Sequence, residues 1–486
     1  MLTIEEIGRL MADDEASELK LAAHVGQRYY EGDHDILGYK LYYTDAHGAL
    51  IEDKTRSNIK IPHPFFTELV DQCVQYMTSG DAPIVRSAKD DDQELQKALD
   101  GYFGDGFRAE LAETLTDACA AGFGYMFARK GPGMRTMFEH AEWSGVIEVR
   151  AKETDANADH VIYWYVDRID KGRKLVKRIQ VWDEEETSYY VRVDNGQIAL
   201  DESELDNPRP HTVYARDGKR YGAGLGFIPF FRLDANRKKF SHLKPVKRLI
   251  DDYDLMSCGL SNNIQDVSEA VWVVKGFQGS DIDELVNNVR TKKQVGVDAD
   301  GDVDVRTIDI PYEARSIKLE TDERNIYRFG MGLNSAQVGD GNITNVVIKS
   351  RYALLDLKCN KLEARLKALM RKLVQIALDE INGVGDKERG YTMSDVSIVF
   401  EREVMTNAAD NAQIELADAQ KRQTEVATLL NVATSYGDDA VQEQICAVLD
   451  LDPEKVRESV PEVQDGGLGA AVSALTGGFW SSDKLT

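Results

Sequence analysis

Apolar side chains in the first third of the chain recur at the spacing of one helix face. Residues 3–28, 63–78, 92–103 and 107–121 each carry hydrophobic positions three or four residues apart, which is typical of amphipathic helices. The segment YYEGDHDILGYK interrupts the pattern as a turn after the first of them. We therefore expect this part of the chain to be helical.

The hydrophobic period changes to two in the middle of the chain. Between residues 125 and 231 the segments IEVRAK, HVIYWYV, KLVKRIQVW, TSYYVRV and HTVYAR are short, aromatic and β-branched, with Asp, Asn and Gly between them. That composition favours antiparallel strands. The DNGQ sequence at 194–197 is typical of a hairpin turn. We predict a mainly β region here.

Helical spacing returns at residues 241–274 and again at 312–333. The insert between them, 275–311, predicts a short helix over 281–290, followed by a hairpin that turns at DADGD, residues 298–302. After the second helix, residues 334–345 are rich in glycine and polar side chains, which indicates a loop.

Residues 346–382 contain neither proline nor internal glycine and predict a single long helix of roughly 55 Å. Its apolar positions alternate in steps of four and three, which is one heptad seam; they are Leu355, Cys359, Leu362, Leu366, Leu369, Leu373 and Ile376. Thr344 or Asn345 can cap its start, and Asn382–Gly383 can end it. Such a rod either spans a multidomain body or a ring, or pairs with a second copy as a coiled coil.

The chain after the rod predicts a strand, SDVSIVFER at 394–402, and then helical sequence from about 407 to 449. Residues 462–486 are rich in glycine and serine and are expected to be loose. The elements together predict an α+β, mainly helical fold of two to four domains in 486 residues.

Charge narrows the possible functions. The net charge is −25, whereas tight binding of nucleic acid requires many lysines and arginines. Positive charge is concentrated in two segments, 232–250 with 7 basic and 1 acidic residue, and 343–382 with 8 basic and 4 acidic residues. Two interpretations stay open. These segments pair with acidic neighbours in the fold or in an adjacent subunit, or they make local contacts with phosphate.

The five cysteines lie far apart and form no CxxC pair, so neither a zinc site nor a disulfide framework is indicated. The acidic, amphipathic N-terminus does not resemble a secretory signal, and no apolar run approaches the ~20 residues that cross a membrane. We expect a soluble protein in a reducing compartment such as the cytoplasm.

Catalytic motifs are missing from the sequence. It contains no GxxxxGK[ST], HExxH or GxSxG, and its eight histidines show no metal-ligand spacing. Residues 298–309 alternate aspartates like a calcium loop, but glycine stands at the fourth position and Asp309 at the twelfth, so a hairpin turn fits better. We predict no enzymatic activity, no cofactor and no metal.

Several segments in register resemble the portal proteins of tailed double-stranded-DNA bacteriophages, in the branch that carries an N-terminal YYxGxHxI motif. The motif corresponds to Tyr29, Tyr30, Gly32, His34 and Ile36. Similar segments follow in order, namely PHPFFTELVDQCVQYMTSGDAP, GFIPFFRLDAN, SHLKPVKRLIDDYDLMSCGLSNNIQDVSEAVWVVKG and NVVIKSRYALLDLKCNKLEARLKALM. The resemblance covers residues 20 to 460.

The resemblance implies a portal fold assembled as a ring, usually of twelve copies. It assigns the parts of the chain as follows: wing, 1–240, with a β-rich part at 125–231; first stem helix, 241–272; clip, 273–311; second stem helix, 312–333; tunnel loop, 334–345; long wing-crossing helix and following strand, 346–405; crown, 406–461; flexible tail, 462–486.

The function implied by the resemblance is that of a head-tail connector at one capsid vertex of the virion. Its homododecameric ring would be the DNA translocation channel for viral genome packaging and ejection, assembled in the host cytoplasm. Implied partners are the terminase large subunit, a head-completion adaptor, and the major capsid and scaffolding proteins. The candidates for contact with DNA in transit lie in and after the predicted tunnel loop; they are Gln337, Asn342, Thr344, Asn345, Lys349 and Arg351.

Two other functions remain to be weighed. A cytoplasmic coiled-coil scaffold without a DNA channel would use the heptad seam of residues 346–382 for self-pairing. A nuclease would bind divalent metal through aspartates and would cleave DNA in the presence of magnesium or manganese.

Overall fold

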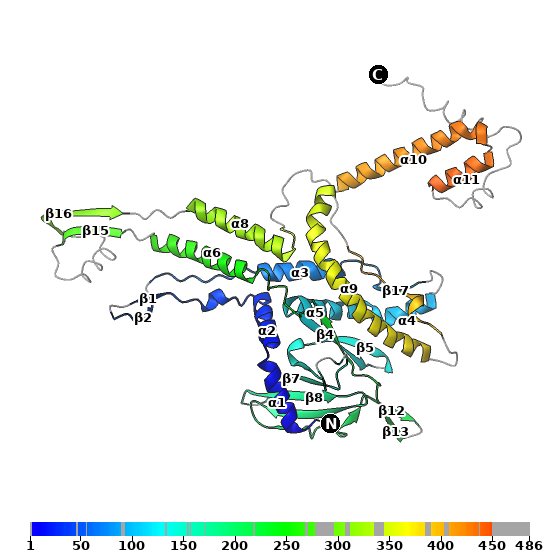
Figure 1. The fold of residues 1–486 in the computed structure, drawn as a ribbon, viewed down its shortest axis with the longest axis horizontal. Coiled ribbons are helices and arrows are strands. Elements are labelled where there is room, and N and C mark those ends of the chain that lie inside the picture. The colour runs from blue at the N-terminus through cyan, green and yellow to red at the C-terminus, as the bar shows by residue number, and fades with distance from the viewer. Residues whose placement is uncertain are drawn as a thin grey trace, which may run out of the picture. The chain divides into compact units, whose positions relative to one another are not determined.

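The computed structural model describes residues 2–44, 47–54, 56–88, 93–131, 134–152, 155, 157–170, 172–216, 219–267, 271–277, 296–306, 312–334, 345–383, 390–402, 408–436 and 438–449. The chain forms two compact units (Figure 1). Unit 1 consists of Met1–Gly339 and Tyr352–Glu403, and unit 2 consists of Asp340–Arg351 and Val404–Thr486.

The helices expected at the N-terminus are present in unit 1. They are α1 (Ile4–Glu15), α2 (Glu18–Tyr30), α3 (Phe65–Thr78), α4 (Gln93–Phe103) and α5 (Asp105–Ala120). The first predicted helix is interrupted at Ser17, because the Ser17 hydroxyl accepts a hydrogen bond from the Lys20 backbone and starts α2. Thr3 and Glu6 form a capping box at the start of α1. The apolar stripe predicted for α3 is buried.

The mainly β region is confirmed. Its largest sheet has the strand order β10-β9-β8-β7-β6, with β11 added beside β9. These strands are β6 (Val146–Val149), β7 (His160–Asp170), β8 (Lys174–Trp182), β9 (Glu186–Val193), β10 (Ile198–Leu200) and β11 (Arg209–Pro210). The predicted turn at 194–197 joins β9 to β10, with Asp194 at φ 48°. The neighbouring strands of this sheet pair antiparallel.

A second, three-stranded sheet has the order β14-β4-β5. It is formed by β4 (Phe123–Lys130), β5 (Thr136–Ala141) and β14 (Phe230–Asp234). Unit 1 also contains short two-stranded sheets besides β15–β16, which is described below. Their strands are β1 (Tyr42–Thr44) with β2 (Leu50–Glu52), β3 (Val85–Ser87) with β17 (Val396–Ile398), and β12 (Thr212–Arg216) with β13 (Lys219–Ala223).

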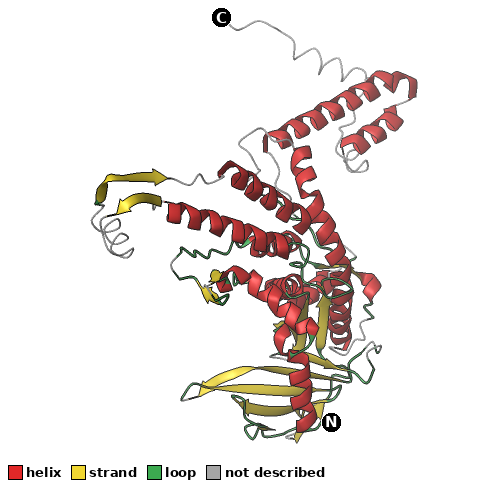
Figure 2. Cartoon of the chain, turned by 60° about the vertical axis from the view of Figure 1, so that its left-hand side comes forward, coloured by secondary structure: helices red, strands yellow, loops and turns green. Residues whose placement is uncertain are grey.

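Two apolar cores join the helices to the sheets. Ile7 and Met11 of α1 pack on the large sheet against Ile162 and Ile179 (Figure 2). The other core surrounds Trp143 and combines it with Phe123 of the three-stranded sheet. Both side chains are fully buried, and burial on this scale contributes roughly 1.5–3 kcal/mol for each large apolar side chain.

Helices α6 (Lys247–Val267) and α8 (Tyr312–Gly330) lie side by side in unit 1 (Figures 1 and 2). The prediction of helix from 241 to 274 was too long at both ends. Residues 241–246 form turns around Pro245, which has no N–H for a helix interior. Residues 271–277 are strand β15 (Val271–Phe277), because they pair with β16 (Val297–Arg306).

The turn predicted at DADGD, residues 298–302, was wrong. These residues lie inside β16, where Asp302 pairs with Lys275 and Val303 with Val274. Between Asp302 and Val297 the register with β15 shifts, so residues 298–301 form an irregular bulge inside the strand instead of the tight turn that the sequence predicts. The short helix predicted at 281–290 lies outside the described residues.

The long helix is α9 (Asn345–Gly383), one residue longer at each end than predicted. Of its predicted seam, Leu355, Cys359, Leu362, Leu366, Leu369 and Leu373 are buried and Ile376 is partly buried. Beyond Leu373 the buried positions become Val374, Ala377, Leu378 and Ile381, since a straight helix drifts away from a strict heptad. Asn382 ties the end of α9 to Tyr391 through two hydrogen bonds of 2.8 and 3.0 Å.

Unit 2 contains the first residues of α9 and the helices α10 (Ala408–Tyr436) and α11 (Asp438–Leu449). They correspond to the helical stretch predicted for 407–449. The expectation of a mixed α+β fold is confirmed. Within the described ranges, no helix is long and apolar enough to span a bilayer. The tail 462–486 is outside these ranges.

Candidate functional site

The candidate site has three parts. They are the α6–α8 helix pair, the strands β15 and β16 that lie between the two helices in the chain, and the contacts that attach α6 to the N-terminal region. Lys318 of α8 links the two helices by an ion pair with Asp252 of α6 at 2.5 Å. It also pairs with Asp322 of its own helix. Tyr327 of α8 donates to Glu68 of α3. The pair is thus bonded to the α/β body as well as to itself.

Asp254 of α6 is the centre of a buried anchor. Its side chain is 1% exposed. His34 Nδ1 lies 2.7 Å from one carboxylate oxygen, and His63 Nδ1 lies 2.8 Å from the other, which also accepts the His63 backbone N–H at 2.9 Å. Two segments that precede α6 by about 200 residues are therefore fixed to one turn of this helix.

The residues of the YYxGxHxI motif belong to this anchor. The Tyr29 ring stacks on His34 at 4.4 Å, and its hydroxyl donates to Asp251 of α6. Lys247, in the first turn of α6, lies 2.5 Å from Asp35 and 2.8 Å from Asp251. Gly32 takes a positive φ of 82° in the turn after α2. In this chain the motif therefore joins the end of α2 to α6.

Acid is expected to weaken the anchor. Burial by itself raises the pKa of Asp254, but hydrogen bonds from His34 and His63 outweigh burial and leave the pKa below its usual value of 3.8. A carboxyl group whose pKa is lower in the folded state stabilises the fold above its unfolded pKa, and the contribution is lost as the pH falls through the folded pKa.

We therefore expect the hydrogen-exchange protection factors in the first turns of α6, corrected for the intrinsic rate at each pH, to fall below about pH 4. In Asp254→Asn this acid-dependent loss of protection should be much smaller, because the titrating group is gone. An identical acid profile in both proteins would show that Asp254 does not control the contact.

Strand β16 carries charge on one side. Asp298, Asp300, Asp302 and Asp304 are exposed. Asp302 and Asp304 lie in the regularly paired part of β16 and point to the same face, whereas Asp298 and Asp300 lie where the register with β15 shifts. Lys275 stands opposite Asp302 on β15. The resulting acidic surface repels polyanions and suits a basic partner.

The predicted DNA-contact residues are only partly described. Gln337, Asn342 and Thr344 lie outside the described residues. Asn345 is the first residue of α9; Lys349 is exposed and Arg351 is partly buried on the same helix. Their role in binding DNA stays a prediction.

The lysines and arginines of the two basic segments fall into two groups in the structure. Some cations are paired, as Lys247 is with Asp35 and Arg232 with Glu148. Others line one cavity of about 770 Å³ between the chain before α6, the end of α8 and the middle of α9; they are Lys244, Lys358, Lys361 and Arg365. The first interpretation, pairing within the fold, therefore accounts for only part of this charge.

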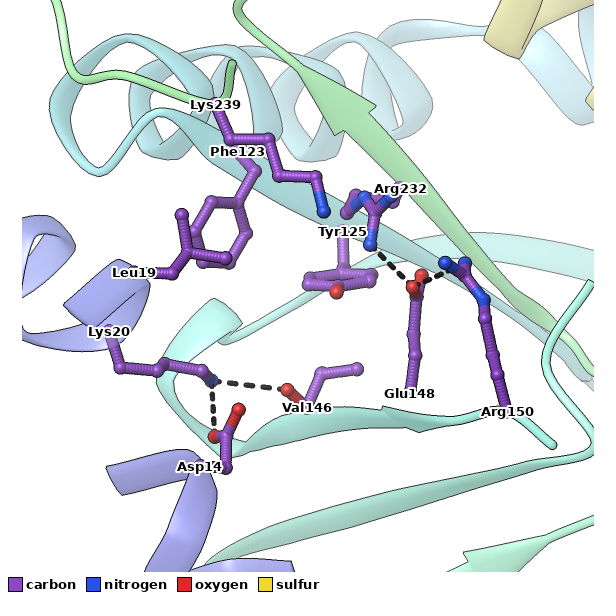
Figure 3. A pocket seen from close by; sticks show the side chains of 10 residues that line it. All are labelled: Asp14, Leu19, Lys20, Phe123, Tyr125, Val146, Glu148, Arg150, Arg232 and Lys239. Atoms are coloured by element: carbon purple, nitrogen blue, oxygen red, sulfur yellow. Dashed lines mark hydrogen bonds and ion pairs between the residues drawn. The ribbon is translucent and has the colours of Figure 1, made fainter. Parts of the chain in front are cut away.

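Another pocket, of about 330 Å³, has mostly satisfied polar groups (Figure 3). Lys20 Nζ donates to the carbonyls of Trp143, Ser144 and Val146 at 2.7–3.1 Å and lies 3.2 Å from Asp14. Glu148 bridges Arg150 and Arg232. The polar contacts around this pocket attach α2 to the two sheets.

In the described part of the chain, no three His, Cys, Asp or Glu side chains are grouped as metal ligands. The five cysteines are free and buried. Cys73 and Cys359 approach to 3.6 Å between their sulfur atoms where α3 meets α9, so they act as small packing groups.

The sequence interpretation missed the Asp254 anchor and the cavity. Asp254 contacts residues about 200 positions away, and no local pattern signals that pairing. The cavity had a partial signal, since both basic segments are interleaved with apolar residues, but only the fold brings them together.

Comparisons with known proteins point to one family. A family model described as "Phage portal protein, SPP1 Gp6-like" matches residues 15–445. The portal protein of Bacillus phage SPP1 is 26% identical over 391 residues, which are 78% of this chain and 75% of that protein. The portal protein of Clostridium phage phiCD119 is 22% identical over 440 residues, which are 85% of this chain and 89% of that protein.

Proposed function

The chain belongs to the SPP1 Gp6-like family of phage portal proteins, and from this premise we propose that it forms a dodecameric ring at one capsid vertex. The centre of the ring is the channel through which DNA enters during packaging and leaves at ejection. The role is structural, and the energy for translocation comes from a separate motor. The family match over residues 15–445 is the observation that carries the proposal.

The helix pair fits the stem of such a ring. Helices α6 and α8 project as a pair toward the β15–β16 strands (Figures 1 and 2), and the buried Asp254 contacts give the pair a rigid base. A ring of stems needs this rigidity, because neighbouring helices must meet at the same height and angle in every copy.

Charge supports a channel that releases its cargo. DNA that is neutralised by many cations is held tightly, since binding releases its counterions. A subunit of net charge −25 gives a repulsive lining in which DNA slides. Residues 334–345, with Lys349 and Arg351 just after them, are proposed to approach the DNA as a tunnel loop.

The remaining parts are assigned by their order in the chain. The acidic β15–β16 strands and the residues between them are proposed as the clip, which docks the terminase large subunit and later the head-completion adaptor. Helix α9 is proposed to cross the wing, and α10 and α11 to form the crown. Capsid and scaffolding proteins contact the assembled ring, which is built in the host cytoplasm and remains in the virion.

The coiled-coil scaffold is not supported, because the heptad seam of α9 is buried within unit 1 and is not free for a second copy. A nuclease is tested by incubating the protein with DNA and magnesium or manganese, and we expect no cleavage.

The proposed function is tested by interrupting the phage gene for this chain. Heads without packaged DNA are expected, and filled heads should return when the chain is supplied from a plasmid. A phage that fills its heads without the chain would contradict the proposal.

Removing both charges with the double substitution Lys349→Gln and Arg351→Gln is expected to change the packaging yield while leaving ring assembly intact. Both residues follow the proposed tunnel loop, and weak phosphate contacts there affect sliding more than subunit association. Packaged DNA is measured by nuclease protection, and ring formation by electron microscopy. Lys372→Gln, an exposed position later in α9, is the matched control.

Loss of assembly in the double variant would mean that Lys349 and Arg351 are structural. Unchanged packaging in the presence of normal rings would remove them from the channel.

A further inference from the structure

The cavity at the middle of α9 is apolar inside and positively charged at its walls. Its volume is about 770 Å³, within the range of sites that receive large ligands or side chains. Apolar side chains line it from three separate segments; they are Phe240, Pro245, Phe329, Met331 and Leu362. Phe240 and Phe329 are 39% and 51% exposed. Large aromatic side chains in this state favour being covered.

Four cations line the same cavity without a carboxylate. Lys358 is buried and donates to the carbonyls of Leu69 and Gly330 at 3.3 and 3.2 Å. Lys244 lies over the Phe240 ring at 3.1 Å. For Lys361 and Arg365 there is no ion pair in the described part of the chain, and no acidic residue of that part lines the cavity. The described residues of unit 1 therefore do not compensate the charge of this wall.

Helix α9 also has a second apolar stripe that continues from the cavity. Leu354 and Leu357 are 41% and 47% exposed, and Ala364 and Ala368 are exposed further along the helix. With Lys361 these positions follow each other in steps of three and four, so they lie on one face. The opposite face carries the buried seam. One side of α9 therefore packs on its own body, and the other is apolar and open.

We propose that this cavity and the exposed stripe of α9 form the docking surface for a second copy of the chain, which contributes an acidic and apolar segment. The occupant is a second copy because the wall is cationic in a protein of net charge −25, so another copy's surface is the complementary one. The inference deepens the proposed ring function and rests on it.

The charge of the surface limits how two copies can meet. Placing this basic wall against the same wall of a second copy would bring like charges together. We expect the wall to meet a different, acidic region of the next copy. Where such contacts are made head-to-tail, they close into a ring when the rotation allows.

Nucleic acid fits this surface less well. Phosphates are bound by exposed cations at a polar surface, whereas here Lys358 is buried and the floor consists of Phe, Leu, Met and Pro side chains. An apolar floor with a cationic wall suits a protein segment that carries both apolar side chains and carboxylates.

The experiment reverses the charge of the wall with Lys361→Glu and Arg365→Glu in the full-length chain. Assembly is measured by light scattering over a range of concentrations, and we expect the concentration at half assembly to rise at least tenfold. Lys174→Glu, exposed on β8 and outside both the cavity and the stripe, should assemble like the natural protein. Leu357→Ser tests the apolar stripe at an exposed position, where misfolding is not expected, and should also weaken assembly. Circular dichroism checks that each variant is folded.

Folded variants that assemble as the natural protein does would overturn the docking surface while leaving the ring itself intact. A natural protein that never assembles would instead contradict the proposed function.

Zero-length carbodiimide crosslinking of mixed isotope-labelled copies locates the occupant. Crosslinks between Lys244 or Lys361 of one copy and carboxylates of another are expected in assembled particles. Crosslinks of these lysines confined to single copies in assembled rings would also overturn the inference.

Discussion

Asp254→Ala is expected to destabilise the protein by about 3–6 kcal/mol, because a hydrogen bond to a charged group contributes roughly 1.5–3 kcal/mol and both imidazoles lose theirs. The carboxylate is 1% exposed and holds both His34 and His63, so its removal leaves two imidazoles and the His63 backbone N–H without their acceptor. Urea unfolding followed by tryptophan fluorescence measures the loss, with both proteins in the same oligomeric state.

Asp252→Ala provides the matched control on the same helix. Asp252 is 45% exposed, and its pair with Lys318 lies at the surface, where such pairs contribute roughly 0–1 kcal/mol. Equal losses in the two variants would mean that the Asp254 contacts are no stronger than a surface ion pair, and the rigid base proposed for the helix pair would have to be abandoned.

The second large effect concerns Gly26→Ala in the middle of α2. Helix propensity alone predicts a gain of about 1 kcal/mol, because alanine is the better helix former. The structure predicts the opposite sign, since a Cβ at Gly26 would collide with the Ala120 carbonyl oxygen at the end of α5 and come within 2.8 Å of the Ser241 hydroxyl. We expect a loss of about 3 kcal/mol, at the upper end of overpacking effects.

Gly8→Ala in α1 separates the effect of helix propensity from the effect of the steric collision. A Cβ there meets only Ile198 Cδ1 at 3.7 Å, an ordinary contact, so this variant should gain roughly 0.5–1 kcal/mol from propensity. Both changes are measured as free energies of unfolding. A stabilised Gly26→Ala protein would show that α2 and α5 are not in direct backbone contact.

Local pattern predicted the helices better than the long-range strands. The bounds of α9 were correct to within one residue, because a proline-free stretch with a regular apolar stripe leaves few alternatives. The sequence at 271–274 favours the end of a helix, since Val267 and Val271 continue the apolar stripe of α6. Its β-branched residues instead pair with β16, about 25 residues later, and no local pattern contains that partner.

The order of the helices in the candidate site could be predicted from the sequence, but the side-chain contacts between them could not. The apolar spacing predicted the two helices of the pair and the long helix in the order in which they occur, and their assignment as stem and wing-crossing helices stays a prediction. The spacing did not reveal that Tyr29, His34 and His63 converge on α6, because their partners Asp251 and Asp254 lie about 200 residues away. The basic segments were visible from their composition, but their meeting at one apolar cavity follows only from the fold.

The central claim is that identical copies close into a ring, and single-particle mass and symmetry of the purified chain test it most directly. The account predicts annular particles with a central opening, one rotational axis and a mass close to twelve times the 54.4 kDa chain. Particles that remain monomeric, or that pair only about a two-fold axis at every protein and salt concentration, would contradict it.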